Sequence, residues 1–267
     1  MSKVFRDYTQ AELDAQYNQR AWVPHADALI ARFAAASDDA RKQLGEPRSE
    51  RYGVSDIETL DIYGKGEKAF IFVHGGAWQR EARRGSAYGA LPVVAAGASF
   101  IVLGFAALPR VTLAEMAGQV CRGIDWVLKN VSKKVVVFGH SSGAHLTACA
   151  LTKIAGIEKA MVVSGLYDMR PVRLSARNAY VKLDDPLEDD LSPIRHAARI
   201  RCPVTVAWAE KDSDDFRRQS NEFAVALQKN NLLTEKFEIK SLNHFEIVET
   251  LADPGSRLCR AALTMLQ

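Results

Sequence analysis

One serine lies in a glycine-flanked turn where it could act as a nucleophile. The apolar run Val135–Phe138 leads into Gly139-His-Ser-Ser-Gly143, and a helical pattern follows directly. A serine on such a strand-to-helix turn projects above the sheet, and glycine fits at the flanking positions because larger side chains would collide with the strand and the helix. The start of the helix directs free amides and a partial positive charge at the site. Ser141 is the predicted nucleophile, and the alternative is a tight turn that happens to contain serine.

A second glycine-rich segment offers hydrogen-bond donors for an anionic intermediate. The strand candidate Ala69–Val73 ends in His74-Gly-Gly-Ala-Trp78. Glycines let the backbone approach a substrate carbonyl without intervening side chains. The predicted donors are therefore the N–H groups of Gly75 and Gly76, together with that of Ser142 after the nucleophile.

The general base must come from one of six histidines, at positions 25, 74, 140, 145, 196 and 244. In a site of this type the base follows the nucleophile and the acid along the chain. His244 follows the last strand candidate, in Leu242-Asn-His-Phe-Glu246, and is the predicted base. His74 precedes the serine and is expected to brace its loop, whereas His140 is expected to border the substrate pocket.

The acid that orients the base is expected after the strand candidate Val204–Trp208. Four carboxylates follow that run: Glu210, Asp212, Asp214 and Asp215. We favour Asp212 by its position and expect the others to form a solvated helix start, where acidic residues suit the helix dipole. Serine, histidine and aspartate would then perform acyl transfer through a covalent acyl-enzyme.

Short apolar runs alternate with amphipathic stretches from about residue 57 onward. Runs of Val, Ile and Phe are typical of strands buried on both faces of a parallel sheet. The alternation predicts an α/β fold with a mostly parallel central sheet and helices on both faces. The strand candidates are Ile57–Tyr63, Ala69–Val73, Phe100–Gly104, Val135–Phe138, Ala160–Val163, Val204–Trp208 and Lys236–Lys240.

Two segments fall outside that alternation. Residues 1–50 are expected to be helical, because Thr9-Gln-Ala-Glu12 fits a capping box and apolar residues recur at helical spacing from Ala26 to Ala34. Residues 167–198 are polar and acidic and include three prolines. We expect an insertion over the sheet, which is either a cap or lid or a solvated excursion. The whole chain, residues 1–267, is expected to form a single domain.

Composition argues against several classes of protein. The net charge is only +3, from 35 basic and 32 acidic residues without a basic block, so we expect no nucleic-acid partner. The apolar runs are shorter than the roughly 18 residues that span a bilayer, and the polar N-terminus predicts no secretory signal. The four scattered cysteines are expected to be reduced thiols. These features predict a cytoplasmic protein and leave a homodimer open. The proposed serine, histidine and aspartate chemistry would act on a small molecule and requires no metal or organic cofactor.

These segments resemble the arylformamidase (kynurenine formamidase) branch of the α/β-hydrolase superfamily, close to hormone-sensitive-lipase-like esterases. The resemblance implies the α/β-hydrolase fold and cleavage of an N-formyl arylamine, such as N-formylkynurenine, into formate and the free amine. It also implies a triad of Ser141, Asp212 and His244, with the oxyanion hole at the three amides named above. It covers about residues 55–260 and is carried by His74-Gly-Gly-Ala-Trp78, Val111-Thr-Leu-Ala-Glu115, Gly139-His-Ser-Ser-Gly-Ala-His145, Asp212-Ser-Asp-Asp-Phe-Arg-Arg-Gln-Ser220 and Asn243-His-Phe-Glu246.

The chain departs from the family pattern after the strand candidate Phe100–Gly104. Relatives usually carry a tyrosine and an aspartate there, and Phe105 and Ala106 replace that polar pair. The pocket or its support is therefore expected to differ. Trp78 is expected either to form a wall of the acyl site or to pack the loop. A broad short-chain carboxylesterase and a non-catalytic binding protein on the same fold are the alternative functions.

Overall fold

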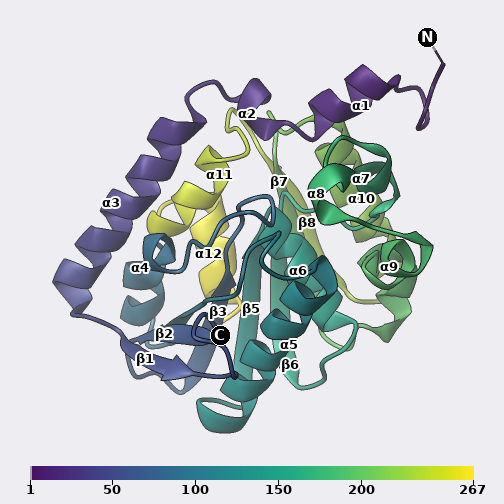
Figure 1. Ribbon diagram of the computed structural model, residues 1–267. Coiled ribbons are helices and arrows are strands. Elements are labelled where there is room, and N and C mark those ends of the chain that lie inside the picture. Colours follow the sequence, from purple (N-terminus) through teal and green to yellow (C-terminus); the bar gives the residue numbers. More distant parts are fainter. Residues whose placement is uncertain (1) are drawn as a thin grey trace.

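The central sheet of this computed structural model, which describes residues 2–267, consists of eight strands. They are β1 (Arg48–Arg51), β2 (Thr59–Tyr63), β3 (Lys68–Val73), β4 (Ser99–Leu103), β5 (Lys134–His140), β6 (Ile157–Val163), β7 (Val204–Ala209) and β8 (Leu233–Ile239). Their order across the sheet is β1-β2-β4-β3-β5-β6-β7-β8 (Figure 1). Strands β3 to β8 run parallel, and β2 is antiparallel to both of its neighbours. The mostly parallel sheet predicted from the apolar runs is confirmed.

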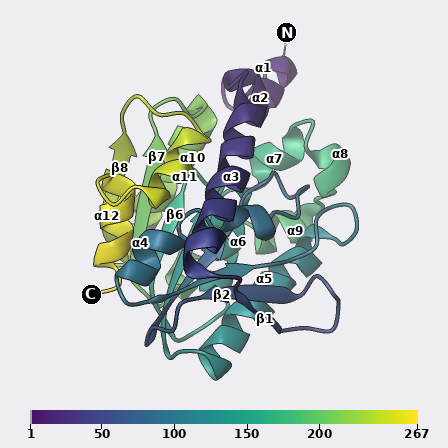
Figure 2. The ribbon, with the colours of Figure 1, turned by 90° about the vertical axis from the view of Figure 1, so that its left-hand side faces the viewer.

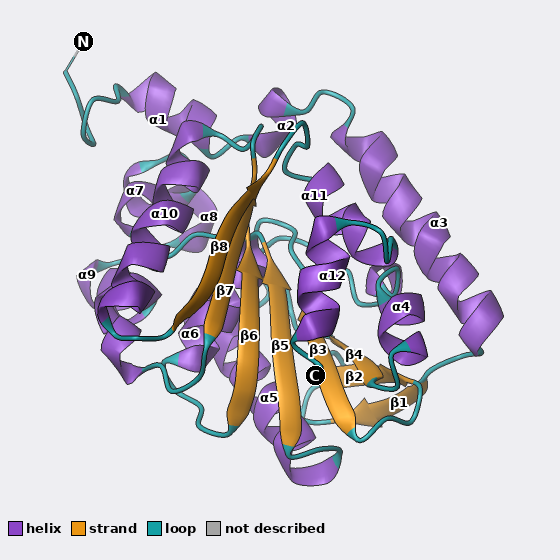
Figure 3. Cartoon of the chain, turned by 180° about the vertical axis from the view of Figure 1, so that it is seen from behind, coloured by secondary structure: helices purple, strands orange, loops and turns teal. Residues whose placement is uncertain are grey.

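Helices cover both faces of this sheet, as the alternating pattern predicts (Figure 3). They are α1 (Gln10–Gln16), α2 (Gln19–Trp22), α3 (Ala26–Leu44), α4 (Ala90–Ala95), α5 (Leu113–Asn130), α6 (Ser142–Leu151), α7 (Arg170–Leu174), α8 (Asn178–Val181), α9 (Asp185–Asp190), α10 (Asp214–Lys229), α11 (Glu246–Glu249) and α12 (Arg257–Thr264). Short 3₁₀ turns lie at Arg84–Ser86, Pro193–Arg199 and Thr250–Ala252.

Alternation along each strand divides the core into two layers. In β3, Phe70 and Phe72 face a layer that includes residues of α4, α11 and α12, whereas Ile71 and Val73 face a layer that includes residues of α5, α6 and α10. Successive side chains of a strand point to opposite faces, so a continuous apolar run buries both sides of the sheet. The sheet is therefore a rigid platform for residues placed at its carboxyl edge.

The N-terminal segment is helical, as predicted: α1 and α2 lie beyond the carboxyl ends of the parallel strands (Figure 3), and α3 runs down in front of the other elements in Figure 2. The capping box at Thr9 is present, since the side chains of Thr9 and Glu12 each accept the other residue's backbone N–H. The predicted helical segment nevertheless ends early. Helix α3 stops at Leu44, and the strand β1 begins at Arg48 and pairs with β2.

Residues 167–198, expected to form either a cap or lid or a solvated excursion, are largely helical. They contain α7, α8 and α9, and Pro186 lies in the first turn of α9, where a missing backbone N–H costs no helical hydrogen bond. Val172, Val181 and Leu191 are buried in the core layer shared with α5 and α6. The segment packs against the body of the protein through these apolar side chains.

The first turn of α10 is tied to the N-terminal segment and is only partly the solvated start that was predicted. Asp214 is exposed, but Asp215 is fully buried. The Tyr17 hydroxyl donates to Asp215 Oδ2, and Arg218 Nε donates to Oδ1 at 2.8 Å. The side chain of Gln16 accepts the Asp215 N–H at 3.1 Å. Two residues of the N-terminal segment thus hold the turn that follows β7.

Within residues 2–267, no helix has the length and apolarity needed to cross a membrane. The four cysteines are all free thiols, and Cys149, Cys202 and Cys259 are buried.

Candidate active site

Ser141 occupies a strained turn between β5 and α6. Its φ and ψ are 57° and −125°, a combination that non-glycine residues rarely adopt. The turn is held because the Ser141 N–H donates to the carbonyl oxygen of Val163 at 2.9 Å, while the Ser141 carbonyl accepts the N–H of His145. The strain lifts the hydroxyl above the carboxyl edge of the sheet, in front of the first turn of α6.

The glycines on either side of this serine have no space for a side chain. A Cβ at Gly143 would come well under 3.0 Å from the carbonyl oxygens of Val73 and His74, and a Cβ at Gly139 would collide with Thr147 and with the backbone of α6. Backbone neighbours cannot move aside as a flexible side chain can. Helix α6 can therefore pack against β3 only with glycine at position 143.

Gly143→Ala is expected to destabilise the fold severely, because the added methyl group forces apart α6 and the end of β3. The thermal midpoint and the soluble yield measure this effect, which should exceed the roughly 1–3 kcal/mol typical of overpacked cores. Gly85→Ala is the matched control, because a Cβ at Gly85 meets nothing within 4 Å and needs no left-handed backbone. A Gly143→Ala protein as stable as the control would contradict the tight packing of this turn.

Three side chains that are distant in the sequence meet at Ser141. The His244 ring lies between the other two, with Nε2 2.9 Å from Ser141 Oγ and Nδ1 2.6 Å from Asp212 Oδ1. An ionised carboxylate only accepts hydrogen bonds, so the proton of the neutral ring lies on Nδ1 and Nε2 accepts from the serine hydroxyl. All three residues are at most 8% exposed. The structure brings together the three residues that the sequence selected.

Asp212 is held in place by its second oxygen. Oδ2 accepts the Ser164 hydroxyl at 2.6 Å and the backbone N–H of Ala209 at 3.0 Å, which leaves Oδ1 for the imidazole. Ser164 directly follows β6 and has a φ of 49°. Sequence reasoning missed this serine, although its position at the carboxyl end of a parallel strand is a usable signal.

The loop after β3 presents its backbone to the nucleophile. A Cβ at Gly75 would meet the Ser141 Cβ at 3.0 Å, so this glycine permits the close approach. Gly76, Ala77 and Trp78 have consecutive positive φ values of 135°, 54° and 61°, a conformation that residues with side chains rarely adopt. The N–H groups of Gly75, Gly76 and Ser142 donate to no acceptor among residues 2–267. They are free to receive an oxyanion.

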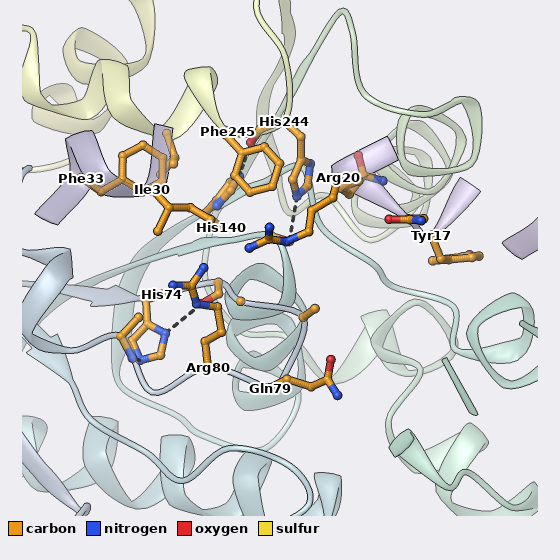
Figure 4. Close-up of a pocket in the computed structure, with 18 of the residues that line it drawn as sticks. Tyr17, Arg20, Ile30, Phe33, His74, Gln79, Arg80, His140, His244 and Phe245 are labelled. Atoms are coloured by element: carbon orange, nitrogen blue, oxygen red, sulfur yellow. Dashed lines mark hydrogen bonds between the residues drawn. The ribbon is translucent and has the colours of Figure 1, made fainter. Parts of the chain in front are cut away.

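A cavity of about 880 Å³ opens above this constellation. Its floor includes Ser141, His244 and the loop from His74 to Ala77. In Figure 4, Ile30 and Phe33 of α3 lie on one side of the cavity, together with Phe245, and the side chains of Arg20 and Arg80 extend into the space between His244 and His74. Ala176, Arg177 and Tyr180 from the 167–198 segment complete the lining. The cavity thus combines an apolar wall with a few polar groups, as small-molecule sites do.

Comparison with known proteins identifies the family. A kynurenine formamidase of Danio rerio is 30% identical to the chain, and the alignment covers 98% of both proteins. The chain belongs to the kynurenine formamidase family. It is a hydrolase with the α/β-hydrolase fold, and the predicted family is confirmed.

Solved structures agree with this kynurenine formamidase family assignment at the level of the fold. A Silicibacter protein provisionally named a thioesterase superposes with a TM-score of 0.85 at 26% identity, over 95% of this chain and 99% of its own. An esterase of the bacterial hormone-sensitive lipase family superposes with a TM-score of 0.66 at 14% identity, over 91% of this chain and 96% of its own. No family model matches the sequence.

Two histidines of this formamidase family member support the site without joining the triad. Burial lowers the pKa of His74 to about 4, so the ring is neutral at pH 7. His74 Nδ1 donates to the Gly75 carbonyl, and Nε2 accepts the N–H of Ala82, which braces the loop as predicted. Burial likewise holds the pKa of His140 well below its usual value. His140 lines the cavity, and its Nε2 donates to the His244 carbonyl at 2.9 Å.

Trp78 does not line the cavity, contrary to one of the two roles predicted for it. The indole is 2% exposed, and its N–H donates to His145 Nδ1 at 3.2 Å. A buried indole N–H needs such a partner, and the left-handed backbone at Trp78 turns the side chain toward α6. The residue therefore packs the loop. A substrate-binding role for Trp78 is not supported.

The apolar pair that replaces the family's usual tyrosine and aspartate also faces the protein interior. Phe105 stacks on the His74 ring with centroids 4.3 Å apart, and the Ala106 N–H donates to Gln119 Oε1 at 2.8 Å. Neither residue lines the cavity. This departure therefore changes how the loop after β3 is supported, while the lining of the cavity comes from other residues.

No cluster of three or more His, Cys, Asp or Glu side chains within residues 2–267 is arranged to hold a metal ion.

Proposed function

We propose that this hydrolase cleaves an aryl formamide through a formyl-enzyme, with N-formylkynurenine as the model substrate and Ser141 as the nucleophile. The observation that carries the proposal is the hydrogen-bonded chain from Ser141 through His244 to Asp212 at the floor of the cavity. The name of the Danio rerio relative supplies the substrate type.

The first half of the reaction forms the formyl-enzyme. His244 Nε2 takes the proton of Ser141 as the serine oxygen attacks the formyl carbonyl. Asp212 fixes the ring and stabilises the imidazolium without itself taking the proton. The positive charge arises beside a buried carboxylate, where the interaction is stronger than it would be in water.

The tetrahedral oxyanion would be held by the amides of Gly75, Gly76 and Ser142. Each well-placed donor lowers the barrier by about 3–4 kcal/mol. These amides have no protein acceptor within residues 2–267, so an oxyanion would not have to displace an existing bond. His244 then passes its proton to the departing arylamine, and water activated by the same imidazole releases formate from Ser141.

The cavity has room for the aromatic part of such a substrate. Ile30, Phe33 and Phe245 offer an apolar wall, and ring contacts of this kind favour a flat arylamine. The formyl group itself needs little space, so it can lie between Ser141 and the closely approaching Gly75.

A short-chain carboxylesterase is the second candidate, because the same residues would cleave an ester. The structural likeness to esterases favours it. We expect the purified protein to cleave formanilide-type substrates with a kcat/KM at least comparable to that for a nitrophenyl acetate. Release of the arylamine and of nitrophenol measures the two rates. Ester turnover that exceeds formamide turnover by orders of magnitude would contradict the formamidase proposal and favour the esterase.

We further propose a cytoplasmic location. Its support is the set of four free cysteines, since thiols stay reduced in that compartment.

A further inference from the structure

Arg177 is a cation in the cavity wall without a carboxylate to balance it. It lies between α7 and α8, in the segment that borders the cavity opposite α3. Within the described chain, its guanidinium hydrogen-bonds only to the carbonyl oxygen of Tyr17. Burial lowers the pKa of the guanidinium; the Tyr180 and Tyr17 hydroxyls partly oppose this effect, but no carboxylate does.

The guanidinium is held with its outer edge free. Nε and Nη2 both donate to the Tyr17 carbonyl, the Nε bond at 3.0 Å. The same group lies over the rings of Tyr17 and Trp78, with its carbon 5.6 Å from each centroid. Nη1 and the second N–H of Nη2 have no partner among residues 2–267. This fixed pair of donors matches the two oxygens of a carboxylate.

The other charged side chains that line the cavity are paired with a protein partner or exposed to solvent. Asp14 accepts the N–H of Ala176, and Glu81 pairs with Arg110 at 3.2 Å. Arg20 pairs with Asp27 at 2.6 Å. Arg80 is exposed and has no carboxylate partner in the described part of the chain. Among the three arginines that line the cavity, Arg177 is therefore the one that is partly buried and has no carboxylate to offset the cost of removing its charge from water.

We propose that Arg177 determines substrate specificity by binding a carboxylate carried on the arylamine part of the substrate. This inference rests on the proposed formamidase function and adds that the preferred substrate carries a carboxylate. A substrate carboxylate would form a bidentate pair with Nη1 and Nη2 and supply the missing counter-charge. The formyl group would then lie at Ser141, and the aromatic ring would lie against the α3 wall.

The test compares two substrates that differ only in this charge: N-formylkynurenine and its primary carboxamide. For the wild type, we expect a lower KM for the carboxylate compound. In Arg177→Gln, the KM for that compound should rise about 10- to 100-fold with little change in kcat, because a ground-state contact is lost. The kcat/KM for the carboxamide should stay within about twofold.

Three further variants test whether the effect belongs to Arg177 rather than to another arginine. Arg170→Gln is the charge-matched control, because Arg170 is exposed and lies outside the cavity lining. It should preserve the wild-type preference. Arg177→Lys keeps the positive charge without the planar fork, so its KM should lie between those of wild type and Arg177→Gln. If Arg80→Gln abolishes the preference and Arg177→Gln does not, the assignment to Arg177 is overturned.

The salt dependence of KM can be measured on the wild type alone, so it tests the inference even if a variant fails to fold. Added salt should raise the KM for the carboxylate compound more than that for the carboxamide, because it screens only the charged pair. Equal KM values for both compounds, or an equal loss on both in Arg177→Gln, would overturn the inference and leave the formamidase function standing. Failure of the wild type to cleave either formamide would instead overturn the proposed function.

Discussion

Replacing Ser141 with alanine is expected to lower kcat/KM for formamide hydrolysis by at least about 10³-fold. The variant loses the atom that forms the covalent bond, and the oxyanion amides and the cavity alone retain only a small part of the catalysis. The fold should be unaffected, because the Ser141 hydroxyl donates only to His244 and takes no part in the hydrogen bonds that hold the turn. Purified variant and wild type are compared by arylamine release and by thermal midpoint.

Ser142→Ala separates the two adjacent serines. Alanine keeps the backbone N–H, so activity should stay within about tenfold of the wild type. A fluorophosphonate should label the wild type at Ser141 and leave Ser141→Ala unlabelled, as mass spectrometry of the peptide would show. Wild-type rates in a clean Ser141→Ala sample would remove this serine from the mechanism.

Asp212→Asn is expected to reduce kcat by about 10³- to 10⁴-fold while leaving the shape of the site intact. Oδ2 receives hydrogen bonds from Ser164 and from the Ala209 N–H, so the amide oxygen of the asparagine must take that place. The amide nitrogen then faces His244 Nδ1, which can only accept its hydrogen bond. The ring proton moves to Nε2, and the ring can no longer accept the proton of Ser141.

Ser164→Ala is the matched control for this argument. It removes one of the two donors to Oδ2 without changing the imidazole tautomer, so kcat should fall by no more than about tenfold. Kinetics of both variants with the same formamide would decide the point. A loss in Ser164→Ala as large as that in Asp212→Asn would mean that the position of the carboxylate, rather than the tautomer it imposes, dominates its role.

The sheet could be predicted because most of its strands are buried on both faces. Runs such as those in β3 and β5 have no polar face, and this composition has few other structural explanations. Strand β1 was missed for the opposite reason. It is an edge strand of four polar residues, three of them exposed, and it is held only by its pairing with β2. Nothing in its local sequence distinguishes such a strand from a loop.

The site residues also divide into those that local sequence reveals and those that depend on distant parts of the chain. The positions of Ser141 and His244 follow from chain order and from the turns that end β5 and β8, which are local features. The choice of Asp212 among four neighbouring acids followed from position, and its geometry depends on Ser164 from another strand. Arg177 could not have been found from sequence, because its unbalanced charge depends on the absence of acids that only the folded chain can reveal.

The burial of Asp215 was unpredictable for a related reason. In sequence it belongs to a run of acids at a helix start, where exposure is the normal outcome. Its burial depends on Tyr17, which lies 198 positions earlier in the chain. Local composition carries no information about such a partner.

The long sequence separation between Tyr17 and Asp215 affects the order in which the protein can fold during synthesis. Gln16 and Tyr17 leave the ribosome 199 and 198 residues before their partner Asp215 at the start of α10. Until then, the polar groups of these two residues can be satisfied only by water, and closing so long a loop carries an entropic cost. The turn that carries Asp212 is therefore locked only after the start of α10 has been synthesised, and a nascent chain that already contains Ser141 gains its complete reactive centre only once His244 has also emerged.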